Sequence, residues 1–137
     1  MALIIYSDGG SRGNPGISAF AIVVCRNGKI IHEHAEFIGV VTNNEAEYRG
    51  LIYAIGYALD SRDDDVEFVM DSKLVIEQMN GNFKVRSEKL APLHRDAKAL
   101  SSAIRNAKFT HVLRSDKMIT VADSLLNRKM DEFSKTG

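Results

Sequence analysis

The dipeptide Asn27-Gly28 restricts the fold of this 137-residue chain more than any other short stretch. It stands between two runs, Ile17–Cys25 and Lys29–Ile38, of which the first is apolar and β-branched in its second half. Asn-Gly is the strongest short signal for a tight hairpin turn, so the two runs are predicted to pair as antiparallel strands. A short apolar run, Leu3–Ser7, is predicted to be a buried strand and precedes a segment rich in turn residues, Gly9–Gly16, which is predicted to be a loop. The chain is therefore expected to begin with three antiparallel strands.

Helices and further strands are predicted after the hairpin. Thr42 and Glu45 have the spacing of a capping box, and apolar residues then recur at helical intervals as far as Asp60. The apolar run Val66–Met70 is predicted to be a buried strand that leads directly into a short helix, Lys73–Met79. The remaining predictions are a helix over Ser87–Asn106, a strand over Phe109–Leu113, a loop over Ser115–Thr120 and a helix over Val121–Phe133. This order predicts an α/β fold in which helices cover the faces of a mixed sheet.

The composition bounds the class of protein. Hydrophobic residues make up 45% and charged residues 26%, which is ordinary for a globular chain, and the length predicts one domain over residues 1–137. The single cysteine, Cys25, excludes an intramolecular disulfide and a Cys-rich zinc site and suits a reducing compartment. No apolar run approaches the roughly 20 residues of a membrane span, so a cytoplasmic protein with no membrane partner is expected. The 18 basic and 18 acidic residues balance, which argues against binding a polyanion by bulk charge.

Four acidic residues are placed where ligands tend to gather in mixed α/β sheets. Asp8 and Asp71 directly follow predicted strands, and Glu47 and Asp123 lie near the starts of predicted helices beside apolar neighbours. Carboxylates that met at one site would repel one another unless cations lay between them, and hard divalent ions, above all Mg²⁺, favour oxygen ligands. The same positions also suit helix caps and first-turn acids, which need no metal. The spacing alone leaves both interpretations open.

Four segments together resemble the signatures of type 1 ribonuclease H, and they occur in the order of that family. They are Ser7–Gly16, Thr42–Leu51, Asp71–Gly81 and Ala122–Asn127. The pattern Asn80–Val85 resembles the short bacterial and archaeal kind, which lacks the basic protrusion of longer members. The resemblance implies a single catalytic domain with a ribonuclease H-like fold. Its sheet would be five-stranded and mixed, with three antiparallel N-terminal strands plus two parallel strands, and helices would flank it.

The resemblance also implies an activity and its cofactors. The chain would be an endonuclease that hydrolyses the RNA strand of RNA–DNA hybrids and leaves 5′-phosphate and 3′-hydroxyl ends. Two Mg²⁺ ions, with Mn²⁺ as a substitute, would be held together with the substrate. With both ions bound, the formal charge of the chain becomes about +4, which weakens the objection to a polyanionic partner. The catalytic and metal-binding residues would be Asp8, Glu47, Asp71 and Asp123.

Substrate contacts follow from the same signatures. Glycines let the backbone approach a sugar closely, and side-chain amides suit a minor groove that displays acceptors and 2′-hydroxyls. Thr42 together with Asn14 resembles a pocket for a DNA-strand phosphate. Residues 84–98 hold five basic and two acidic residues, so Lys84, Arg86 and Lys89 are expected to contact the hybrid backbone. The expected substrate-binding residues are Gly9, Gly10, Asn14, Thr42, Asn43, Asn44, Ser72, Lys84 and Arg86.

The stretch before Asp123 departs from the family pattern. Residues 111–121 form a longer connection than usual, and Ile119 stands where the family has an Asn. Longer family members place a mobile His in this loop, which here has none, so Arg114 and Lys117 are the candidates for a loop contact. Asp116 competes with Asp123 for the role of fourth carboxylate, and the surrounding motif favours Asp123.

Other functions remain compatible with these residues. One alternative is that the chain cleaves double-stranded RNA, in addition to hybrids or in place of them. A second alternative is that the unusual loop impairs catalysis and leaves a module that binds hybrids. A transposase or resolvase core belongs to the wider superfamily, but the run Thr42-Asn43-Asn44 suits RNA contact and argues against it. His32 and His34 share a strand face with no third ligand nearby, so an exposed hairpin face is predicted there rather than a metal pair. A monomer is expected.

Overall fold

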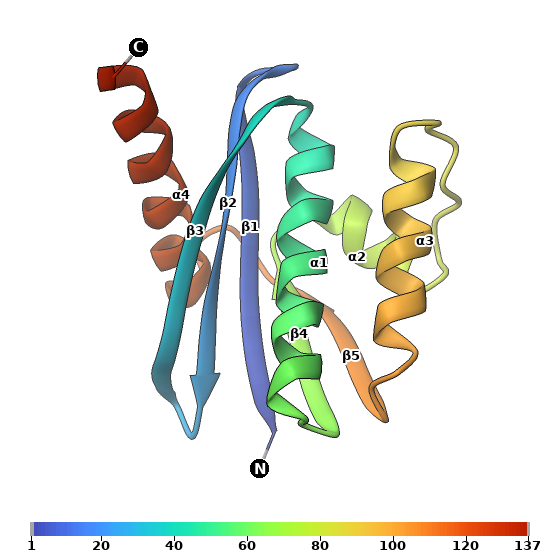
Figure 1. Cartoon of the computed structure of the whole chain (residues 1–137). Coiled ribbons are helices and arrows are strands. Elements are labelled where there is room, and N and C mark those ends of the chain that lie inside the picture. The colour runs from blue at the N-terminus through green and yellow to red at the C-terminus, as the bar shows by residue number, and fades with distance from the viewer. Residues whose placement is uncertain (1, 137) are drawn as a thin grey trace.

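The computed structural model describes residues 2–136, and within them a five-stranded sheet lies between two layers of helices (Figure 1). The strands are β1 (Leu3–Gly13), β2 (Gly16–Arg26), β3 (Lys29–Val41), β4 (Asp65–Met70) and β5 (Asn106–His111). The helices are α1 (Asn43–Ser61), α2 (Lys73–Met79), α3 (Leu90–Ser101) and α4 (Lys117–Thr136). Between residues 2 and 136, no helix combines the length and apolar character that crossing a bilayer requires.

The sheet has the strand order β3-β2-β1-β4-β5. The pairs β1–β2 and β2–β3 are antiparallel, whereas β4 runs parallel to both β1 and β5. This arrangement confirms the predicted mixed sheet with three antiparallel N-terminal strands and two parallel strands. The hairpin turn is also confirmed, because Asn27 and Gly28 both have positive φ angles, of 56° and 75°.

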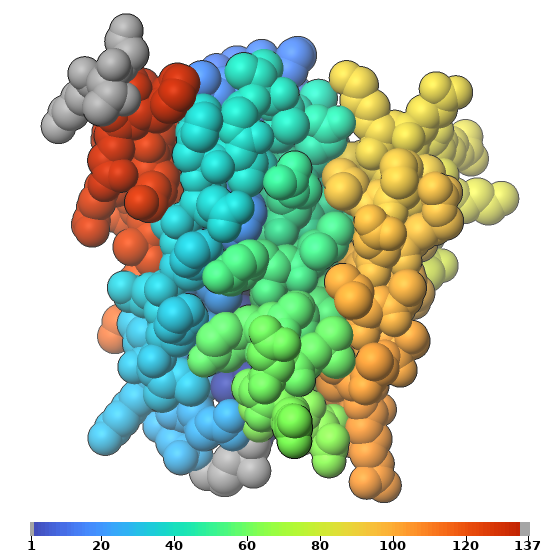
Figure 2. Space-filling view, in the orientation of Figure 1, coloured from blue at the N-terminus to red at the C-terminus, as the bar shows by residue number. Residues whose placement is uncertain are grey.

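Apolar side chains form one core on each face of the sheet. The larger core lies under α1, α2 and α3 and includes Tyr48, Phe68 and Met79. The smaller core lies under α4 and includes Val23, Cys25 and Leu126. Figure 2 shows β3, α1 and α3 side by side on the face that carries the larger core. With a core on each face, the centre of the sheet is fixed against movement in either direction.

The N-terminal strand is longer than its composition predicts. The loop expected over Gly9–Gly16 is wrong for residues 9–13, because these residues continue β1 and pair with β2 as far as Gly13 opposite Gly16. Gly9 allows a close contact between two backbones and does not form a turn. A Cβ on Gly9 would lie 2.3–2.5 Å from backbone atoms of Ala46 and Glu47, so only glycine lets β1 and α1 approach this closely.

Helix boundaries also differ towards the C-terminus. The predicted loop Ser115–Thr120 is wrong from residue 117, where α4 begins, because the carboxylate of Asp116 accepts hydrogen bonds from the backbone N–H groups of Met118 and Ile119. Ile119 is completely buried and anchors the first turn of the helix. The other predicted ends move by two to five residues, as α3 covers Leu90–Ser101 and β5 covers Asn106–His111.

The histidine face of β3 is packed rather than exposed. His32 stacks on Tyr57 and His34 stacks on Tyr53 of α1, with ring centroids 5.0 Å and 4.5 Å apart. The prediction of an exposed hairpin face is therefore wrong for these two side chains. Their rings join the edge strand to α1.

The contact at Gly9 gives a stability prediction. Gly9→Ala forces the backbones of β1 and α1 apart and is expected to lower the free energy of unfolding by about 3 kcal/mol. Gly56→Ala is the matched control, since a Cβ there meets no atom within 4 Å and alanine stabilises a helix interior by roughly 0.5–1 kcal/mol. Urea titrations of both variants measure the two effects. Equal free energies for the two variants would contradict the close approach.

Candidate active site

Three carboxylates converge where β1, α1 and β4 meet. Asp8 lies on β1, Glu47 lies on α1, and Asp71 directly follows β4. The parallel register pairs Tyr6 with Val69, so the positions two residues further on, Asp8 and Asp71, stand side by side. One carboxylate oxygen from each of the three acids lies within 4.8 Å of those of the other two. The cluster therefore combines one residue from each of three elements that are far apart in sequence.

Burial and mutual repulsion oppose the charged forms of these acids. Only 6% of Asp8 and 5% of Glu47 is exposed. Burial, together with the negative charges of Asp71 and Asp123, raises the pKa of Asp8 to about 8. Burial and the charges of Asp8 and Asp71 raise the pKa of Glu47 well above its usual range. Burial also raises the pKa of Asp71, although its own backbone N–H and the positive charge of Arg114 oppose this rise.

These carboxylates fit a divalent cation. Within residues 2–136, Glu47 Oε2 is a buried side-chain oxygen without a hydrogen-bond partner, which is costly for a carboxylate unless a cation meets it. Three oxygen donors at this spacing form the kind of set that Mg²⁺ and related hard ions bind. A cation would also favour the ionised acids over the protonated forms that burial promotes.

The structure separates the two candidates for the fourth carboxylate. Asp123, on α4, lines the same pocket as Asp8, Glu47 and Asp71, and its charge contributes to the raised pKa of Asp8. Asp116 instead caps the N-terminus of α4 through its side chain. The residue that the surrounding motif favoured is thus the one beside the carboxylate cluster.

We call the cavity around the acids the carboxylate pocket. Its volume is about 370 Å³, and several residues expected to contact substrate line it, namely Gly9, Gly10, Asn43, Ser72 and Arg114. Arg12 and Asn127 also line it, although the sequence motifs did not assign them a role. Arg12 forms an ion pair of 2.7 Å with Asp131 and contacts Asn127, so it ties the end of β1 to α4. The position of Arg12 inside the first signature segment, Ser7–Gly16, is the sequence feature that points to a role for it in the site.

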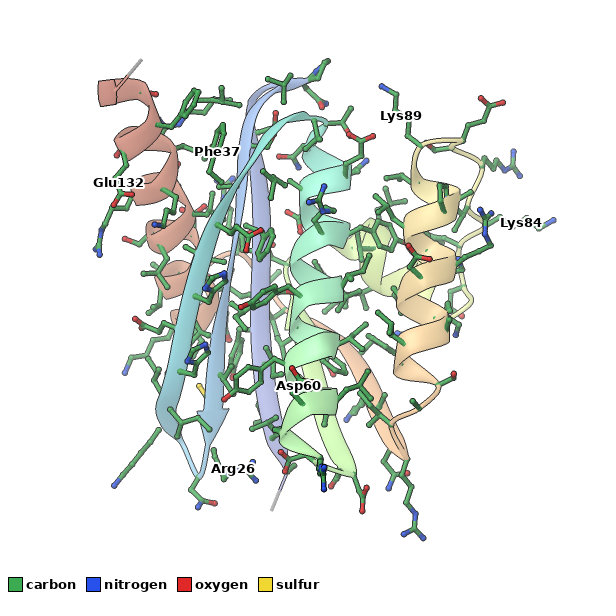
Figure 3. The ribbon with its side chains drawn as sticks, in the orientation of Figure 1. Arg26, Phe37, Asp60, Lys84, Lys89 and Glu132 are labelled. Atoms are coloured by element: carbon green, nitrogen blue, oxygen red, sulfur yellow. The ribbon has the colours of Figure 1, made fainter. Side chains whose placement is uncertain are left out.

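A second cavity, here called the basic pocket, brings together the other expected substrate residues. Its volume is about 450 Å³, and its lining includes Asn14, Thr42, Asn44, Lys84, Arg86 and Lys89. Figure 3 shows Lys84 and Lys89 extending outward from the part of the molecule that carries α3. Lys117 is exposed at the start of α4 and lines neither pocket.

Two polar residues of the basic pocket have defined hydrogen bonds. Asn14 Oδ1 accepts a hydrogen bond of 3.0 Å from the backbone N–H of Asn43. Thr42 forms both halves of the capping box with Glu45, so its Oγ1 accepts from the Glu45 backbone N–H. The Asn14 amide nitrogen and the Thr42 hydroxyl hydrogen are left to donate. Donors of this kind suit an anionic oxygen.

The raised pKa of Asp8 gives a prediction for the metal-free protein. An aspartate has a pKa near 3.9 when unfolded, so between about pH 4 and pH 8 the folded state binds more protons and stability decreases as pH rises. In EDTA, Asp8→Asn is expected to flatten this decrease and to raise the free energy of unfolding at pH 8.5 by about 2 kcal/mol. Urea titrations at pH 5 and pH 8.5 measure this effect, and parallel pH dependences for both proteins would contradict it.

Comparisons with known proteins agree with this geometry. A family model described as reverse transcriptase-like matches residues 6–129. The chain is 38% identical over 128 residues to Ribonuclease HI of Halobacterium salinarum, a match that covers 93% of this chain and 63% of that protein. Proteins from Mycobacterium bovis and Mycobacterium tuberculosis are 41% identical over 99% of this chain, which spans 37% of their length.

Solved structures agree over nearly the whole chain. An N-terminal RNase H domain from Mycobacterium tuberculosis, solved as a fusion with maltose-binding protein, gives a TM-score of 0.91 at 39% identity and covers 98% of this chain and 97% of its own. LC11-RNase H1, solved in complex with an RNA/DNA hybrid, gives a TM-score of 0.88 at 34% identity, with 95% and 97% covered. The chain therefore belongs to the type 1 ribonuclease H family, in a short form like that of its bacterial and archaeal relatives.

Proposed function

We propose that this chain is a metal-dependent ribonuclease H that hydrolyses the RNA strand of RNA–DNA hybrids. The observation that carries the proposal is the convergence of Asp8, Glu47 and Asp71, with an unpartnered buried oxygen on Glu47. A relative that is 34% identical, over 95% of this chain, has been solved with an RNA/DNA hybrid, which supports the same substrate class here.

The proposed cofactor is a pair of Mg²⁺ ions, for which Mn²⁺ substitutes. Asp8, Glu47, Asp71 and Asp123 would hold them, because these four acids line one pocket and the first three bring their oxygens within 4.8 Å of one another. When bound, such ions activate a water and stabilise charge on the leaving oxygen. The carboxylates themselves orient the site, and the expected products carry 5′-phosphate and 3′-hydroxyl ends.

The two pockets divide the proposed substrate contacts. Around the carboxylates, Gly9 and Gly10 offer backbone without side chains, and Asn43 and Ser72 offer polar groups to the RNA strand. In the basic pocket, the amide nitrogen of Asn14 and the hydroxyl of Thr42 donate to a DNA-strand phosphate. The remaining contacts in that pocket come from Asn44, Lys84 and Arg86.

The unusual connection before α4 is compatible with catalysis. Its added length forms a capped first helical turn, and Asp123 still lines the carboxylate pocket. Arg114 lines that pocket too and is the proposed loop contact, because its charge acts on Asp71. These observations favour an active enzyme over an impaired binding module.

A cleavage assay tests the activity. Labelled RNA–DNA hybrid, RNA duplex and DNA duplex are each incubated with Mg²⁺ or Mn²⁺. We expect cleavage of the RNA strand of the hybrid. Asp8→Asn is expected to lower the cleavage rate by more than about 100-fold, because losing a residue that only supports a metal ligand costs up to about that much. Hybrid binding without cleavage would support the impaired module, whereas preferential cutting of the RNA duplex would support the double-stranded RNA alternative.

The fourth carboxylate has a matched pair of variants. Asp123→Ala is expected to abolish hybrid cleavage, because it removes an acid from the carboxylate pocket. Asp116→Ala is expected to retain kcat and to lose about 1 kcal/mol of stability, the usual cost of a helix cap. Turnover and thermal unfolding are measured for both. Loss of turnover in the Asp116 variant alone would reverse the assignment.

The basic pocket is tested by salt dependence. We expect Lys84→Gln/Arg86→Gln to reduce the slope of log affinity against log salt by roughly 0.9 for each phosphate that the variant no longer neutralises. Lys29→Gln/Arg105→Gln removes the same charge from exposed positions outside both pockets and is expected to leave the slope nearly unchanged. Fluorescence anisotropy with a labelled hybrid measures the slopes. Equal slopes for wild type and both variants would exclude the proposed interaction of Lys84 and Arg86 with phosphates.

A further inference from the structure

Gln78 is a buried amide outside the carboxylate cluster. It lies on α2 with 5% of its surface exposed, and its Oε1 accepts a hydrogen bond of 2.6 Å from the hydroxyl of Tyr48 on α1. Tyr48 itself is completely buried in the larger core. A buried amide with a short, defined bond is held in one orientation, because any other orientation would leave a polar atom unsatisfied.

The other end of this amide faces an exposed stretch, Asn82–Lys89, which we call the basic segment. Gln78 Nε2 donates to the carbonyl oxygen of Lys84 at 3.5 Å, which is a long contact. The side chain of Gln78 thus links α1 to the basic segment. On its backbone side, the Gln78 carbonyl lies 3.2 Å from His94 Nε2, which adds a link to α3.

The basic segment has little support of its own. At its start, the backbone N–H groups of Asn82 and Phe83 bond to the carbonyl of Glu77, and at its end Ser87 Oγ accepts from Leu90. Between these points the described chain forms no helix or strand, and a polar side chain reaches its backbone through the long contact from Gln78 to Lys84. Val85 adds a half-buried apolar contact. The Gln78 amide therefore influences the positions of Lys84 and Arg86.

The link has a direct relation to the catalytic acids. Tyr48 follows Glu47 on α1, so one turn of one helix presents a carboxylate to the carboxylate pocket and a hydroxyl to Gln78. Gln78 in turn lines the basic pocket together with Lys84 and Arg86. The basic segment is thereby connected, through Gln78 and Tyr48, to the helix that carries Glu47.

We propose that Gln78 is a positioning residue for the nucleic acid, with Tyr48 as its anchor. It holds the basic segment so that Lys84 and Arg86 meet the hybrid backbone while the RNA strand lies at the carboxylates. The inference rests on the proposed function and deepens it, since it names the group that sets the spacing between the two pockets. An amide that served core stability alone would influence folding but not binding.

The test uses substitutions that keep the shape of the side chains. Gln78→Met removes both polar ends, and Tyr48→Phe removes only the hydroxyl, which protects the packing of the core. For each variant we expect KM for the hybrid to rise by about 5-fold, the range for removing one hydrogen bond, with kcat within twofold of wild type. In the Lys84→Gln/Arg86→Gln background, Gln78→Met is expected to raise KM no further.

Each outcome supports or overturns the positioning role. An unchanged KM in both variants, or a rise of the same size in the Lys84→Gln/Arg86→Gln background, would overturn it. A fall in kcat in proportion to thermal stability would assign Gln78 to folding alone and would also overturn it. If wild type cleaves no hybrid, the proposed function fails separately, and anisotropy of a labelled hybrid with wild type and Gln78→Met still tests the link, with weaker binding by the variant expected.

Discussion

The parallel pairing of β1 with β4 is the constraint on which the rest of the site depends. It fixes Asp8 and Asp71 as neighbours across two strands that are about sixty residues apart in the chain, a separation that no local preference could span. Gly9 then lets α1 approach β1 so closely that Glu47 joins the pair. The register of two parallel strands and the absence of a side chain at Gly9 thus bring the three acids together.

Such an assembly is held against its own repulsion. Desolvation and like charges raise the pKa values of Asp8 and Glu47, and the polar backbone of Gly9 partly opposes both rises. The two apolar cores on either face keep the elements from relaxing apart. Such electrostatic repulsion lowers the stability of the fold at this point, and it is expected at a site that binds a charged ligand.

Local chemistry explains what the sequence could predict. The Asn27-Gly28 turn, the Thr42–Glu45 capping box and the helix Lys73–Met79 each depend on residues within a few positions of one another, and all three are confirmed. The local pattern around Gly9 predicts a loop, because the role of Gly9 depends on its contact with α1, which is distant in sequence. The stacking of His34 on Tyr53 and the burial of Gln78 also depend on distant residues, so local patterns do not predict them. The four acids carried a recognisable signature, but their convergence needed the sheet register.

The hydrogen bond from the Asn43 backbone to Asn14 has a consequence for the entropy of association. It joins the β1–β2 turn to the first residue of α1, and the capping box fixes the neighbouring Thr42 at the same time. Donor groups on two separate elements are therefore already immobilised before any ligand arrives. A phosphate that met them would lose its own freedom but would not have to order the protein, so the usual entropic cost of closing loops around a ligand is avoided.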